Sequence, residues 1–79
     1  MSDIFDGMRQ ILTQRFHAAE EQLTPDASLD DLGMDSLDRV EFALMLEQAH
    51  GIRFGSDVDG VRTLAQTAAL IARKKGAVE

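Results

Sequence analysis

The sequence predicts an all-α protein: a small antiparallel four-helix bundle with three main helices, a short third helix and a long first loop. Apolar residues recur at spacings of three and four in three separate segments, which is the spacing of one helix face. No segment alternates apolar and polar residues in the way of a half-buried strand. Because 79 residues suffice for one small domain, we expect residues 1–79 to fold as a single unit.

The first predicted helix covers about residues 3–17, with Ser2 as its N-terminal cap. Its apolar stripe consists of Ile4, Phe5, Met8, Ile11, Leu12 and Phe16. We interpret His17, near the end of this helix, as a surface residue. Turn-forming residues dominate from 18 to 35, where Ser28 is expected to cap a short helical turn. Three spaced leucines are expected to hold this loop to the core: Leu23, Leu29 and Leu32.

The second predicted helix covers about residues 36–50 and ends at Gly51, a typical C-terminal stop. A short third element is expected to follow Ser56, which would cap it. Its inward-facing side chains are expected to be Val58 and Val61. The last helix covers about residues 64–75, and its basic final turn suits the negative end of the helix dipole. Its apolar residues are Leu64, Ala68, Leu70 and Ile71.

The second helix carries two apolar faces. At about 100° per residue, one side is expected to face the core and holds Phe42, Ala43, Leu46 and Ala49. A narrower apolar stripe on roughly the opposite side holds Leu37, Val40 and Leu44. Acidic residues lie among or beside this stripe: Asp38, Glu41 and Glu47. The stripe either packs under the long loop or serves as a docking surface with apolar contacts and steering acids.

The negative charge is concentrated in the middle of the chain. The formal net charge is −6, but residues 20–59 carry eleven acids against Arg39 and Arg53, a net charge of −9. This excess argues against nucleic acid and anionic membranes as partners and favours a basic protein surface, although a solvated acidic surface explains it equally well. Cysteine is absent, which excludes disulfides, thiolate metal sites and a thiol nucleophile. Without a predicted signal peptide or membrane span, we expect a cytoplasmic protein.

Ser36 stands at the start of the second helix, among acids and close to Gly33. A hydrolase serine needs a histidine base, yet His50 would lie about 21 Å away at the other end of the same helix. Ser36 is therefore a poor nucleophile by itself, and we expect no enzyme activity. It is either an N-cap or a hydroxyl that another enzyme modifies.

The motif Asp-Leu-Gly-Met-Asp-Ser-Leu-Asp at residues 31–38, followed by Val-Glu-Phe at 40–42, resembles that of acyl carrier proteins of the fatty-acid and polyketide type. The resemblance covers essentially the whole chain. It implies that Ser36 carries 4′-phosphopantetheine, delivered from coenzyme A by a phosphopantetheinyl transferase, whose thiol holds acyl groups. It implies further partners with basic patches, namely an acyl-loading ligase or acyltransferase and a ketoacyl synthase. It also implies a monomer without a metal.

The resemblance assigns roles to two sets of side chains. The docking positions would be Asp35, Leu37, Asp38, Val40, Glu41, Leu44 and Glu47. The acyl-chain cavity would be lined by Phe42, Leu46, Phe54, Val61, Leu64 and Ala68, for which plain core packing is the alternative. Three features depart from the family pattern: Arg39, His50 and the glycine-containing segment 51–60. An aminoacyl or peptidyl carrier and an unmodified helical adaptor that docks through its second helix stay open as alternatives.

Overall fold

The computed structural model describes residues 3–77, without the side chains of residues 58, 59 and 77, and its regular elements are helical. In chain order they are α1 (Asp3–Arg15), η1 (Glu20–Gln22), α2 (Ser36–His50), η2 (Gly55–Gly60) and α3 (Leu64–Ala77), where η denotes a 3₁₀-helix. Within these residues the single β-type pairing is an isolated bridge between Ser28 and Thr63. The predicted all-α fold is confirmed. The short third helix is a 3₁₀-helix rather than an α-helix.

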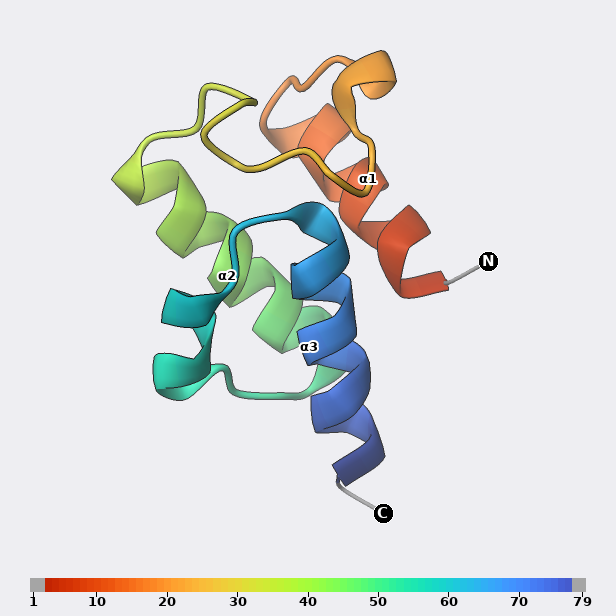
Figure 1. The fold of residues 1–79 in the computed structure, drawn as a ribbon, viewed down its shortest axis with the longest axis vertical. Helices are drawn as coiled ribbons and strands as arrows, with labels where there is room; N and C mark the ends of the chain where they lie inside the picture. The colour runs from red at the N-terminus through yellow and green to blue at the C-terminus, as the bar shows by residue number, and fades with distance from the viewer. Residues whose placement is uncertain (1–2, 78–79) are drawn as a thin grey trace.

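The helices enclose one apolar core. α1 packs against both α2 and α3, and the connection between α1 and α2 runs across the top of the molecule in Figure 1, with η2 at the lower left. The buried apolar residues come from every α-helix and from the connections: Met8, Leu12, Leu23, Ala27, Met34, Phe42, Leu46, Ile52, Phe54, Leu64, Leu70 and Ile71. The ring of Phe42 on α2 meets that of Phe16 edge-on, with 6.0 Å between the ring centroids.

α1 forms as its apolar stripe predicts, with Met8 and Leu12 fully buried against the core. The helix ends two residues earlier than predicted because His17 adopts a left-handed backbone, with φ of 60°. The Ala18 N–H then donates to the Leu12 carbonyl at 3.0 Å, which closes the helix end. His17 is exposed, as predicted, whereas the predicted Ser2 cap lies outside the described residues.

Residues 16–35 connect α1 to α2 through η1 and a series of turns. Leu23 is buried, while Leu29 and Leu32 are partly buried against the core, so the prediction for these leucines is confirmed. Ser28 and Asp31 form a reciprocal cap: the Asp31 N–H donates to Ser28 Oγ and the Ser28 N–H to Asp31 Oδ2, each at 3.1 Å. The connection is therefore held to the core by side chains and internally by local hydrogen bonds.

α2 has the predicted bounds and ends at Gly51, whose φ of 66° allows the left-handed turn. Phe42 and Leu46 are fully buried on its core side, and Ala43 is partly buried. The prediction that Ala49 also faces the core is wrong, because its side chain is exposed. Ala49 lies in the last turn of α2, where the core-facing side of the helix extends past the packed interior.

η2 and α3 correct one prediction and extend another. η2 begins at Gly55, so Ser56 lies inside the element and does not cap it. Val61 is partly buried as predicted, and the side chain of Val58 lies outside the described residues. α3 extends two residues further than predicted, to Ala77, and its start is closed by a reciprocal cap that the sequence analysis missed. The Gln66 N–H donates to Thr63 Oγ1 at 3.1 Å, and the Thr63 N–H donates to Gln66 Oε1 at 3.2 Å.

Candidate functional site

Ser36 is the first residue of α2, and Asp35 is the N-cap. The Asp35 backbone is extended, and its Oδ1 accepts a hydrogen bond from the Asp38 N–H at 2.9 Å. The Asp35 carbonyl accepts from the Arg39 N–H at 3.0 Å, which begins the helical ladder. Because Asp35 performs the capping, the interpretation of Ser36 as an N-cap is wrong.

The hydroxyl of Ser36 is therefore available for another purpose. Its side chain is exposed, and within residues 3–77 its Oγ has no hydrogen-bond partner. Gly33, three residues earlier, has a φ of 75° in the turn that leads the chain to α2. Within the described residues neither histidine hydrogen-bonds to Ser36: His17 lies beyond the end of α1, and the Nδ1 of His50 lies 3.4 Å from Lys75 Nζ.

Arg39 brings a positive charge to this acidic helix start. Its Nη1 lies 3.1 Å from Oδ1 of Asp30, so it joins α2 to the preceding turn. Both side chains are substantially exposed, so this ion pair contributes little to stability, in the range of about 0–1 kcal/mol. Its main effect is on charge, because it neutralises the carboxylate of Asp30 in the turn before α2.

The apolar strip of α2 faces solvent. Leu37, Val40 and Leu44 are 66%, 56% and 52% exposed, and they are the large apolar side chains that the described part of the chain leaves exposed. The alternative that this strip packs under the first connection is thereby excluded. Asp35 and Glu41 nearby are exposed, whereas Asp38 and Glu47 are half-buried.

A groove of about 400 Å³, here called the Ser36 groove, begins at Ser36 and runs between α2 and the start of η2. Its lining comprises Ser36, Arg39, Val40, Ala43, Leu44, Glu47, Phe54 and Gly55. The α2 members recur at three to four residues, so they share one side of the helix between the core and the apolar strip. Ser36 and Glu47 mark its two ends along α2, about 16 Å apart at 1.5 Å per residue.

A second, largely enclosed space of about 50 Å³, here called the inner cavity, lies deeper between α2 and the η2–α3 segment. It is lined by Leu29, Arg39, Phe42, Ala43, Leu46, Phe54, Val61, Arg62 and Thr67. Four of the six predicted cavity residues are thus brought together. Leu64 and Ala68 do not line it: Leu64 is fully buried in the core and Ala68 is partly buried beside it.

The inner cavity is small in this conformation. An apolar cavity of about 150 Å³ accommodates a benzene molecule, so a space of about 50 Å³ is too small for a chain of several carbons. A longer apolar group requires the surrounding elements to move apart. Among the helices around the cavity, η2 is a short 3₁₀-helix, whose internal hydrogen bonds have poorer geometry than those of an α-helix. It is therefore the helix expected to move.

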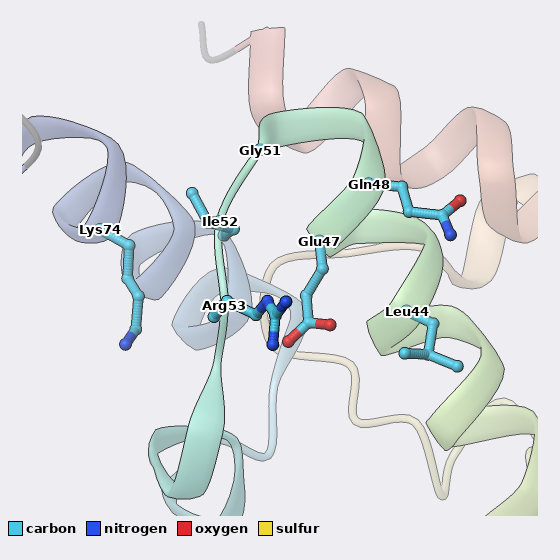
Figure 2. Close-up of a pocket in the computed structure, with 7 residues that line it drawn as sticks. All are labelled: Leu44, Glu47, Gln48, Gly51, Ile52, Arg53 and Lys74. Atoms are coloured by element: carbon cyan, nitrogen blue, oxygen red, sulfur yellow. The ribbon is translucent and has the colours of Figure 1, made fainter.

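A wider surface groove, about 740 Å³, lies at the other end of α2 and does not include Ser36. Figure 2 shows its lining, with Leu44, Glu47 and Gln48 on α2, the segment of Gly51, Ile52 and Arg53, and Lys74 on α3. Its size alone does not make it the functional site. It is open, and the described residues that line it offer no nucleophilic hydroxyl.

Comparison with known protein families gives one match that covers most of the chain: the family model of the phosphopantetheine attachment site (PP-binding) matches residues 6–71. The chain belongs to this family. Carrier domains of the family hold 4′-phosphopantetheine covalently and are not themselves enzymes. The matched range includes most of α1, all of η1, α2 and η2, and the first part of α3. It therefore contains every residue that lines the Ser36 groove and the inner cavity.

The residues of this carrier domain fit the group. Ser36 offers a free, exposed hydroxyl for a phosphoester, and the N-terminus of α2 provides partial positive charge for the phosphate. The Ser36 groove has an apolar floor on which the arm would lie, formed by Val40, Ala43 and Phe54. None of the helices within residues 3–77 has the length and apolar character to span a bilayer.

Two contributors to the carrier site were missed by the sequence analysis. Asp35 was assigned to docking, and its role as the cap of α2 was not recognised, because Asp and Ser are both strong N-cap residues and stand side by side here. Glu47 was also assigned to docking alone, yet its Oε2 accepts a hydrogen bond from the Phe54 N–H at 2.8 Å. No local pattern in the sequence indicates a contact across seven residues and a helix end.

Proposed function

We propose that the protein is an acyl carrier protein in which Ser36 is the attachment residue. The thiol of 4′-phosphopantetheine would carry acyl groups as thioesters between enzymes of fatty-acid, polyketide or specialised lipid biosynthesis. One observation carries the assignment of Ser36: Asp35 caps α2, so the Ser36 hydroxyl at the helix start is exposed and has no partner within the described residues.

The loading step needs a second enzyme. The Ser36 Oγ forms a bond to the pantetheine-linked phosphorus of coenzyme A, and the adenosine bisphosphate leaves. The Ser36 proton passes to a base of the phosphopantetheinyl transferase, which also supplies Mg²⁺. The carrier contributes an exposed hydroxyl and a helix N-terminus that favours the bound phosphate. Within the described residues the Ser36 Oγ has no hydrogen-bond partner that would take its proton.

Loading tests the assignment directly. Incubation with coenzyme A and a broad-specificity phosphopantetheinyl transferase should add one phosphopantetheine per chain, measured by intact-protein mass spectrometry. Ser36→Ala should abolish the mass increase, and Ser56→Ala, which changes an exposed serine on η2, should leave it unchanged. An unmodified wild-type protein, or a modified Ser36→Ala variant, would refute the assignment and favour an unmodified adaptor.

We further propose that partners dock on the face of α2 that holds the apolar strip. Burial of Leu37, Val40 and Leu44 would provide affinity, and the flanking carboxylates of Asp35, Asp38, Glu41 and Glu47 would steer a basic surface into register. The partners expected on this face are the transferase, an acyl-loading ligase or acyltransferase, and a ketoacyl synthase. The carrier itself would act as a monomeric single domain of residues 1–79.

The inner cavity supports acyl rather than aminoacyl cargo. Most of its lining is apolar, so it offers an alkyl chain contacts that a charged α-amino group would lose on burial. Loading with an octanoyl group should shift the methyl resonances of Leu46, which is fully buried and lines the cavity. An alanyl group should not shift them. Equal shifts from both cargoes would contradict the proposed cargo class.

A further inference from the structure

Phe54 lies between the two spaces beside Ser36. It lines both the Ser36 groove and the inner cavity, together with Arg39 and Ala43. Arg39 is exposed and Ala43 has a small side chain, whereas Phe54 is only 3% exposed and is the largest apolar group that the two spaces share. Phe54 is therefore the side chain best placed to form a barrier between the groove and the cavity.

Phe54 is held from the α2 side by Glu47. The Phe54 N–H donates to Glu47 Oε2 at 2.8 Å in a partly buried setting. The Glu47 carbonyl also accepts a hydrogen bond from the Ile52 N–H at 3.1 Å. The segment that follows α2 is thus attached to one residue through both its side chain and its backbone. Figure 2 shows Glu47 projecting from α2 toward this segment.

The chain turns sharply beyond this contact. Gly55 has a φ of 59° and begins η2. Within η2, the Asp57 carboxylate lies 2.8 Å from Lys74 Nζ on α3. The Asp57 N–H also donates to the Phe54 carbonyl at 3.1 Å. Phe54 is therefore held through its carbonyl by η2 and through its N–H by Glu47.

Glu47 differs from a carboxylate that serves only to steer a partner. Glu41, also on α2, is exposed and makes no hydrogen bond or ion pair within the described residues. Glu47 is half-buried, lines the Ser36 groove and has one oxygen engaged by the protein's own backbone. A steering charge requires none of these features.

We propose that Glu47 is a positioning residue that holds Phe54 as the barrier between the Ser36 groove and the inner cavity. Its hydrogen bond keeps the passage closed, and loss of that bond lets Phe54 and the start of η2 move. The effect of Glu47 on the movement of an acyl chain rests on the proposed attachment at Ser36. Its effect on the Phe54 backbone can be measured in the unmodified protein.

Two substitutions separate the reach of Glu47 from its charge. Glu47→Asp keeps the charge but shortens the side chain by one methylene, so it loses contact with the Phe54 N–H. Glu47→Gln keeps the length and an acceptor oxygen but removes the charge. Glu41→Asp, on the exposed side of the same helix, is the matched control for the lower helix propensity of aspartate.

The first measurement is hydrogen exchange of the Phe54 amide in the unmodified protein, with far-UV circular dichroism to confirm folding. Glu47→Asp should raise the exchange rate about fivefold, because the amide loses one hydrogen bond of ordinary strength. Glu47→Gln and Glu41→Asp should change it less than about twofold. A similar increase in the Asp and Gln variants of Glu47, or none in either, would overturn the proposal. This result does not depend on Ser36 being modified.

The second measurement uses octanoyl-loaded protein and relaxation dispersion of the Leu46 methyl groups, which report on the inner cavity. Glu47→Asp should speed the exchange between chain-in and chain-out states about fivefold, and Glu47→Gln should leave it near the wild-type rate. Equal rates in all variants would refute the barrier role even if the amide result holds. If Ser36 proves not to be loaded, the attachment assignment fails, and the amide measurement still decides the role of Glu47.

Discussion

Replacement of Asp35 by alanine tests whether Asp35, rather than Ser36, caps the start of α2. Asp35 Oδ1 accepts the Asp38 N–H at 2.9 Å, and within the described residues no other side chain caps this helix end. The substitution leaves that N–H to water and removes a negative charge from the positive end of the helix dipole. Ser36 is already the first residue of α2. To cap the helix in place of Asp35 it would have to leave the helical conformation, so it does not readily replace Asp35.

The expected loss is worked from these two contributions. A capping Asp→Ala change costs about 1 kcal/mol, and the charge–dipole attraction adds about 0.3–1 kcal/mol, so Asp35→Ala should lower the free energy of unfolding by about 1.5 kcal/mol. Asp35→Asn keeps the acceptor oxygen and should lose only about 0.5 kcal/mol. A 79-residue domain has a total stability of about 4–12 kcal/mol, so both variants should fold.

Urea unfolding followed by circular dichroism at 222 nm measures the difference. The midpoint should fall for Asp35→Ala with an unchanged m-value, and the thermal midpoint should fall by about 6–12 °C. Asp26→Ala is the control: Asp26 is exposed and makes no hydrogen bond or ion pair within residues 3–77, so its change should stay within about 0.5 kcal/mol. If Asp35→Asn proved as destabilising as Asp35→Ala, or Asp35→Ala as mild as the control, the assignment of the cap would be wrong.

Three further outcomes are expected. Phe42→Ala should cost about 3–5 kcal/mol of unfolding free energy in a urea titration, because Phe42 is fully buried, whereas Leu44→Ala should cost less than about 0.5 kcal/mol and instead slow loading by the transferase. Gly51→Ala should cost about 1 kcal/mol, because Gly51 has a φ of 66°, and Gly51→Asn should cost less. Burial and, second, Lys75 hold the pKa of His50 below its ordinary value of 6.5. The unfolded chain therefore binds this proton more readily, so stability should fall as the pH drops from about 6.5 through the lower folded pKa. His50→Gln should flatten that dependence, and a proton NMR titration of His50 measures the pKa directly.

The α-helices were predictable because the apolar residues of each recur at the helical spacing where that helix packs against the core. The stripe on α1 and the stop at Gly51 have local causes, namely the burial of residues one turn apart and the left-handed conformation that glycine allows. The end of α1 was placed too late because a non-glycine residue, His17, adopts the left-handed conformation there. Asn, Asp and His do so often enough to occur but too rarely to predict.

The candidate site was predictable as far as its position, and less so in its contacts. The motif around Ser36 and the solvent-facing strip both follow from residue order on one helix. The contact of Glu47 with Phe54 does not, because it depends on how the chain returns after Gly51. The same holds for Leu64 and Ala68, whose helix face points into the core rather than into the inner cavity.

In the proposed docking mode, the two apolar faces of α2 explain how a small domain presents its attachment position accurately to partner enzymes. A bundle of this size can cover only one face, and Phe42 and Leu46 occupy it. Leu44 on the other face is eight residues from Ser36, about 12 Å along a rigid axis. A partner that docked on Leu44, as we propose, would therefore meet Ser36 at a set distance and angle along the helix. The cap at Asp35 keeps the helix regular up to Ser36, its first residue. In the proposed docking mode, the stability of the cap and the placement of Ser36 therefore depend on the same contact.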